Sequence, residues 1–163
     1  MKKKLFTSVL ASALIVPAVV VPASTETPFK DIAETSLYAE AAAFLKSENI
    51  ITGYADQTFR PTENISRQHV ISILTKLVDL QPVREAKTFA DVPSTHPYYE
   101  AIQQAYRAGI IDGDAQNNFN PDAPITRAQV AKILALAFDL KASTSIAIQD
   151  VPPTHWSSEY VQA

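Results

Sequence analysis

The sequence predicts an all-α protein built from tandem helix–loop–helix repeats. Two observations lead to this prediction. First, residues 29–80 align with residues 89–140 at a constant offset of 60 without a gap, and a third copy begins at Ile148 and stops at Ala163. Second, each copy holds two stretches in which apolar residues recur with the spacing of a helix. We therefore expect repeated units that bury their apolar faces against one another.

Residues 1–23 have the pattern of a secretory signal peptide. Three lysines precede an apolar stretch over 5–21, and small residues favour cleavage after Ala23. Cleavage after Ala18 is an alternative. So is an N-terminal membrane anchor, because the apolar stretch approaches the roughly 20 residues that span a bilayer. Pro17 and the small-residue site favour the signal peptide, so we expect a secreted protein with no membrane-embedded segment after cleavage.

The mature chain over 24–163 is acidic and contains no cysteine. Without the three lysines of the leader it holds 11 basic and 17 acidic residues, a formal charge of −6. Nucleic-acid binding requires clustered Lys and Arg to neutralise phosphates. The composition therefore argues against nucleic acid as a partner.

The repeat divides this mature chain into three parts. We expect repeat 1 with its linker over 24–87 and repeat 2 with its linker over 88–147. The truncated start of a third repeat occupies 148–163.

Each repeat begins with a helix that a left-handed residue closes. We expect these first helices over 37–48 and 98–108, because apolar residues recur there at i, i+4 and i+7. Asn49 and Gly109 follow at the same repeat position, and both residue types favour the left-handed conformation that ends a helix. The expected inward positions are Tyr38, Ala42 and Leu45, with Tyr98, Ile102 and Ala105 in the second copy.

The second helix of each repeat is expected over 66–78 and 126–138, with Ser66 and Thr126 as N-caps. The second copy has Gln129 three residues after its N-cap, which completes a capping box. The first copy has a histidine there and fits the box only at its first position.

Several short motifs occur in the order and at the period of a known module. They are the Phe-x-Asp openings at Phe29 and Phe89, the pair His155-Trp156, the Gly-Ile-Ile-x-Gly element Gly109–Gly113 and the stretch Ile125–Gln129. On these residues each unit resembles an S-layer homology (SLH) domain, a module of bacterial surface proteins. The resemblance covers nearly all of the mature chain.

The resemblance implies both a fold and a function. The fold would be a pseudo-threefold helical bundle, here incomplete, with grooves between neighbouring repeats. The implied function is non-covalent attachment of an exported protein to the bacterial cell wall or S-layer. The implied partner is secondary cell-wall polysaccharide, often bearing a pyruvate ketal, or peptidoglycan.

Two other functions stay open. The chain is either the N-terminal fragment of a surface-tethered polysaccharide-degrading enzyme or an S-layer lattice module without carbohydrate binding. The chain itself has no cysteine nucleophile, Gly-x-Ser-x-Gly elbow or phosphate loop, so we expect no catalytic residues. His96 and His155 occupy equivalent turn positions, whereas His69 lies on the expected second helix of repeat 1. The stretch 112–123 lacks the glycine and glutamate of a calcium loop. We therefore expect no metal and no cofactor.

Arg67 and Arg127 are candidate ligand-binding cations. Each lies one residue past an N-cap, where free N–H groups and the helix dipole favour anions. A guanidinium there can hold a carboxylate through two hydrogen bonds. The ketal carboxylate that the resemblance implies would be such a ligand. The alternative is that each arginine only pairs with Asp31 or Asp91 of a neighbouring unit.

Five further residues complete the candidate carbohydrate-binding set: Gly53, Gly113, Asp31, Asp91 and Trp156. Each glycine either lets a sugar approach the backbone or adopts a positive φ. The aspartates are expected to cap the turn before the first helix, with binding of sugar hydroxyls as the alternative. The tryptophan either stacks on a pyranose ring or packs as a wedge.

The third repeat stops inside its first helix, so it lacks its own arginine and second helix. We expect the apolar faces of the two complete second helices to be exposed as a result. Exposed stripes of this kind favour partner docking or aggregation. We therefore expect a fragment or the product of a truncated reading frame, not a self-sufficient anchor. We also expect self-association through the incomplete bundle.

Overall fold

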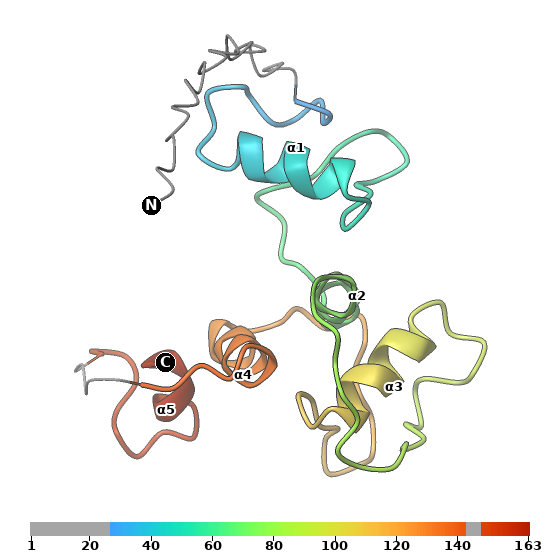
Figure 1. The fold of residues 1–163 in the computed structure, drawn as a ribbon, viewed down its shortest axis with the longest axis vertical. Helices are drawn as coiled ribbons and strands as arrows, with labels where there is room; N and C mark the ends of the chain where they lie inside the picture. Colours follow the sequence, from blue (N-terminus) through green and yellow to red (C-terminus); the bar gives the residue numbers. More distant parts are fainter. Residues whose placement is uncertain (1–26, 143–147) are drawn as a thin grey trace, which may run out of the picture.

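The described part of the chain consists of helices joined by turns and loops. A computed structural model describes residues 27–142 and 148–163, and these residues form five α-helices and no β-strand (Figure 1). The predicted all-α fold class is confirmed. The predicted signal peptide over 1–23 and the linker residues 143–147 lie outside the described residues.

The first helix of each repeat forms where the apolar spacing predicts it. α1 spans Ala39–Ser47 and α3 spans Tyr99–Arg107, each one or two residues inside the predicted bounds. Asn49 follows α1 with a φ of 57°, and Gly109 follows α3 with a φ of 76°. Both left-handed closures are confirmed, and glycine adopts this conformation without a steric penalty.

The second helices begin at the predicted N-caps. α2 spans Arg67–Leu77 and α4 spans Arg127–Ala137. At α4 the hydroxyl of Thr126 accepts the N–H of Gln129 at 3.2 Å, and the Gln129 side chain accepts the N–H of Thr126 at 3.0 Å. The predicted capping box is confirmed. At α2 the serine N-cap makes no such bond, and its hydroxyl lies 3.0 Å from Nδ1 of His69 instead.

Each second helix packs on the first helix of the following repeat. α2 lies against α3, and α4 lies against α5, the single turn Ser158–Val161 that opens the third repeat (Figure 1). In the larger core, Ile71 and Leu74 of α2 share a cluster with Ile102 of α3 and Phe119. The packing unit is thus offset by half a repeat from the sequence unit, so neighbouring repeats stabilise one another.

A smaller core belongs to repeat 1. Its buried residues are Phe29, Ile32, Ala39, Ala42 and Ile51, and Ile73 of α2 packs against them. α1 contributes mainly alanines, so it buries little apolar surface. In Figure 1 this unit lies at one end of the molecule, with α2 between it and α3.

A short backbone joint fixes the start of α2 against the loop of repeat 2. The N–H groups of Arg67 and Gln68 donate to the carbonyl oxygens of Ala123 and Pro121 at 3.0 and 2.9 Å. The side chain of Gln68, which is buried, also donates to Asp122 at 2.6 Å. The joint satisfies N–H groups that a helix N-terminus leaves unpaired.

The apolar surface of repeat 2 is exposed where its counterpart in repeat 1 is covered. Leu134, Phe138 and Leu140 are 41%, 51% and 47% exposed, whereas Leu74 and Leu80 are 3% and 8% exposed. The reason is the length of the covering helix. α3 has nine residues and α5 has four, so α5 covers less of its partner.

Candidate functional site

Arg67 lies at the joint between the repeats and faces the loop of repeat 2. Its Nε donates to the carbonyl oxygen of Phe119 at 2.9 Å, and its guanidinium carbon lies 4.6 Å from the centre of the Phe119 ring. Burial lowers the pKa of Arg67, although the carboxylates of Asp91 and Asp114 oppose this shift. The guanidinium is therefore held by groups within the protein.

Arg127 occupies the same repeat position but is exposed. Its NH2 group lies 2.7 Å from Oδ2 of Asp150, and the two side chains are 69% and 66% exposed. This is an ion pair with the next unit, made with Asp150 instead of Asp31 or Asp91. An exposed pair contributes only about 0.2–1 kcal/mol, so a ligand can displace it at little cost.

The two candidate aspartates hold loops of their own repeats. The carboxylate of Asp31 accepts the backbone N–H groups of Phe59 and Arg60 at 2.7 and 2.6 Å. Asp91 makes the same two bonds in repeat 2, at 2.8 and 2.6 Å. Desolvation raises the pKa of Asp31, but these bonds outweigh it and hold the pKa below its ordinary value. The predicted cap of the turn before the first helix is wrong, because both carboxylates bind backbone about 28 residues further along.

The two candidate glycines lie beside phenylalanine rings. A Cβ at Gly53 would collide with the ring of Phe29, and a Cβ at Gly113 would lie 2.7 Å from the ring of Phe89. Gly53 has a φ of 70°, whereas the φ of Gly113 is outside the left-handed region. Close approach of a ring therefore requires glycine at both positions, and the positive-φ interpretation applies to Gly53 alone.

Trp156 lies on the surface. Its side chain is 54% exposed, and its ring centre lies 5.5 Å from that of His155. Leu37 and Pro97 hold the same repeat position, and both are exposed. This arrangement favours the stacking interpretation over the wedge.

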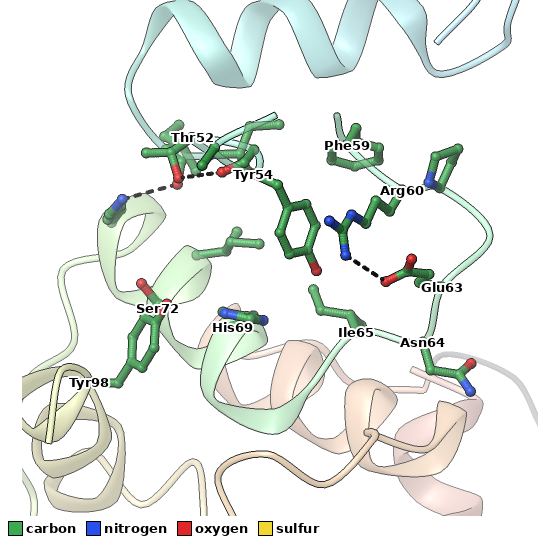
Figure 2. Close-up of a pocket in the computed structure, with 17 residues that line it drawn as sticks. Thr52, Tyr54, Phe59, Arg60, Glu63, Asn64, Ile65, His69, Ser72 and Tyr98 are labelled. Atoms are coloured by element: carbon green, nitrogen blue, oxygen red, sulfur yellow. Dashed lines mark hydrogen bonds and ion pairs between the residues drawn. The ribbon is translucent and has the colours of Figure 1, made fainter. Parts of the chain in front are cut away.

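A groove of about 600 Å³ lies between the loop of repeat 1, α2 and the start of α3 (Figure 2). One wall is the loop over 50–65, and the other is a face of α2 that includes His69, Ser72 and Lys76. Tyr98, the N-cap of α3, also lines the groove, so repeat 2 contributes to it. The volume falls within the range of small-molecule pockets, about 300–1,000 Å³.

Aromatic side chains and hydrogen-bonding groups alternate along the groove. Tyr54 projects between Arg60 and His69 (Figure 2), and its ring centre lies 3.8 Å from the guanidinium carbon of Arg60. His69 meets Tyr98 edge-on, with ring centres 5.4 Å apart. Such faces stack on sugar rings, while neighbouring polar groups bind hydroxyls. The arrangement therefore suits a carbohydrate.

Of the seven candidates chosen from the sequence, only Gly53 lines this groove. The groove residues that the sequence analysis missed differ between the two repeats. Choosing candidates from residues that both repeats share therefore left them out. They are Tyr54, Arg60, His69 and Lys76. The signal in the sequence was that repeat 1 alone has an aromatic residue at Tyr54 and cations at Arg60 and Lys76.

The described residues offer no metal centre. Within 27–142 and 148–163, no group of three His, Asp or Glu side chains is placed to hold a metal ion. In the same part of the chain, no helix has the length and apolar character needed to cross a membrane.

Comparison with protein families decides what the repeats are. The model of the S-layer homology domain matches residues 28–71 and 88–131, which together make up more than half of the chain. The chain belongs to the S-layer homology domain family. Each matched SLH segment runs from the Phe-x-Asp opening into the second helix, so it includes the loop that lines the groove in repeat 1.

Similar proteins include surface proteins and an enzyme. The SLH chain is 32% identical over 145 residues to a cell surface protein of Thermoanaerobacter kivui, covering 86% of this chain and 18% of that protein. It is 28% identical over 163 residues to an S-layer protein of Bacillus licheniformis, covering 96% and 18%. It is 32% identical over 112 residues to an endoglucanase of Bacillus sp. (strain KSM-635), covering 69% and 12%. The chain spans less than a fifth of each of these three relatives. Its SLH repeats indicate association with the cell surface.

Proposed function

We propose that the SLH repeats anchor an exported protein to the bacterial cell wall by binding secondary cell-wall polysaccharide. The observation that carries this proposal is the groove of repeat 1, which presents aromatic faces beside hydrogen-bonding side chains. The SLH family membership and the S-layer relative support a site at the cell surface.

In this proposal a sugar ring stacks on the exposed face of Tyr54. Arg60 and Ser72 are placed to hydrogen-bond its hydroxyl groups, and Gly53 lies in the same wall of the groove. Because Tyr98 comes from repeat 2, the site requires both repeats.

The remaining sequence candidates differ in the groups of the protein that hold them. Arg127 and Trp156 are exposed and form the second set of residues that we propose for polymer contact. For Arg67, Gly113, Asp31 and Asp91, contact with carbohydrate stays a prediction, since each of them is engaged by groups within the protein.

Sedimentation with purified cell-wall sacculi tests the anchoring function. The purified chain is expected to sediment with sacculi that carry the polysaccharide and to stay in solution with sacculi from which it has been extracted. Equal sedimentation with both would point to peptidoglycan. Binding to neither would favour a lattice module without carbohydrate binding.

The Tyr54→Ala variant tests the groove. Loss of one stacking face costs about 1 kcal/mol, so the affinity for intact sacculi is expected to fall about fivefold. The matched control is Leu37→Ala, which removes an exposed apolar side chain outside the groove. Equal affinity of wild type and Tyr54→Ala would exclude the groove. If Arg127→Ala then lost binding, the contact would lie with the second set of residues alone.

The endoglucanase relative supports a second proposal. In it, the same repeats tether a polysaccharide-degrading domain to the wall. The reading frame beyond Ala163 in the genome decides between this cargo and an S-layer protein.

A further inference from the structure

The groove of repeat 1 takes one aromatic side chain from repeat 2. This is Tyr98, the N-cap residue of α3. Of the described residues that line the groove, the others all lie between Ile50 and Lys76. The turn that leads into α3 therefore decides where the contribution of repeat 2 lies.

A histidine holds this turn. Nδ1 of His96 accepts the backbone N–H of Tyr98 at 3.2 Å. The backbone of His96 also closes two turns, because its N–H donates to Pro93 at 2.8 Å and its carbonyl oxygen accepts the N–H of Tyr99 at 3.0 Å. The Tyr98 side chain itself makes no cap bond to α3, so the His96 ring satisfies an N–H group at the helix start. One ring nitrogen thus fixes the backbone from which the tyrosine side chain projects.

The Tyr98 ring lies between this turn and α2. Its centre is 5.4 Å from the ring centre of His69 of α2, which it meets at 86°, and 6.1 Å from that of His96. Figure 2 shows Tyr98 and His69 at the same end of the groove. Among the described residues, His69 lines the groove and His96 does not. A shift of the turn would therefore move the Tyr98 ring relative to the groove wall without removing any groove residue.

The same histidine turn recurs in repeat 3. Nδ1 of His155 accepts the N–H of Ser157, the N-cap residue of α5, at 3.3 Å. Repeat 1 has Ser36 at this position. The histidine thus occurs in the two repeats whose first helix packs on a second helix, as α3 does on α2 and α5 on α4. This pattern links the turn to the joint between repeats, where the groove lies.

We propose that His96 is a positioning residue for the groove, and that it acts by holding Tyr98 in place for contact with the polymer. The inference rests on the proposed carbohydrate-binding function. Because Nδ1 accepts the N–H of Tyr98, the neutral ring carries its proton on Nε2. Asparagine at position 96 keeps an acceptor, since its side chain bonds the N–H two residues further along in an Asx turn. Alanine removes the acceptor.

Affinity for purified cell-wall sacculi tests this role. His96→Ala is expected to bind about fivefold more weakly than wild type, and His96→Asn to recover most of the loss. Ser36→Ala, the control at the same turn position of repeat 1 and outside the groove, is expected to bind like wild type. A wild-type chain that does not bind would overturn the proposed function and this inference with it. Binding by wild type and His96→Ala with equal affinity would overturn only the positioning role, as would a His96→Asn variant as weak as His96→Ala.

Two further measurements separate positioning from a general loss of stability. Tyr98→Ser introduces the N-cap residue of α5, and in this background His96→Ala is expected to cause no further loss of affinity, because His96 acts through Tyr98. A further loss would overturn the proposal. Long-range proton–nitrogen correlation NMR of the wild-type chain is expected to show His96 protonated on Nε2 alone at neutral pH. A proton on Nδ1 would overturn the proposal even if the alanine variant failed to fold.

Discussion

Arg67 and Arg127 share a repeat position, yet their guanidinium groups have different partners. Asp91 is already bound by two N–H groups of its own loop, so Arg67 bonds the carbonyl oxygen of Phe119 beside it. Asp150 has no such loop among the described residues and pairs with Arg127 directly. The partner of each arginine therefore depends on what the next repeat supplies.

The contact of the Phe29 ring with Gly53 predicts that a larger residue at position 53 destabilises the protein. Gly53→Ala places a Cβ against the ring of Phe29 and forces a non-glycine residue to a φ of 70°. We expect it to lower the free energy of unfolding by about 3 kcal/mol, combining overpacking with the left-handed penalty. Urea denaturation followed by circular dichroism measures the change.

Gly109→Ala is the matched control, because Gly109 has a φ of 76° but its added Cβ would meet only Val83, at an ordinary 3.4 Å. Its cost is expected to be about 1 kcal/mol, the conformational penalty alone. Equal costs at Gly53 and Gly109 would show that the Phe29 ring moves aside without penalty.

The two second helices differ in how their N-termini are satisfied. Thr126→Ala removes the capping box of α4 and is expected to cost about 1 kcal/mol. Ser66→Ala at α2 is expected to cost less, since its hydroxyl makes no cap bond and the joint with the loop of repeat 2 already satisfies two N–H groups. Thermal unfolding of the two variants compares them, and a larger loss for Ser66→Ala would contradict this account.

Helix bounds and caps could be predicted because they depend on neighbours within a few residues. Thr126 and Gln129 are three positions apart, and Asn49 closes α1 through its own φ. The groove could not be predicted in this way, because it brings Tyr54 together with Tyr98 from the next repeat. Alignment of one repeat with the other likewise does not show that each second helix packs on the first helix of the following repeat.

At the scale of the whole molecule, each repeat is stabilised by packing against the next one. α2 fills the larger core together with α3, while α1 has only the small core of repeat 1 and Ile73 to hold it. α5 is too short to cover α4 as α3 covers α2. Among the described residues, the core that α2 shares with α3 is therefore the larger of the two, and apolar side chains around α4 are exposed.

The exposed surface around α4 predicts self-association. Leu134, Phe138 and Leu140 expose apolar area that water disfavours, so copies of the chain are expected to associate as concentration rises. Sedimentation velocity over a concentration series measures this. The double variant Leu134→Lys, Leu140→Lys is expected to stay monomeric, because pairing two such faces would bury charge. Leu37→Lys, a control at an exposed position outside α4, is expected to associate like wild type. A wild-type chain that remains a compact monomer at every concentration would show that this face needs no partner.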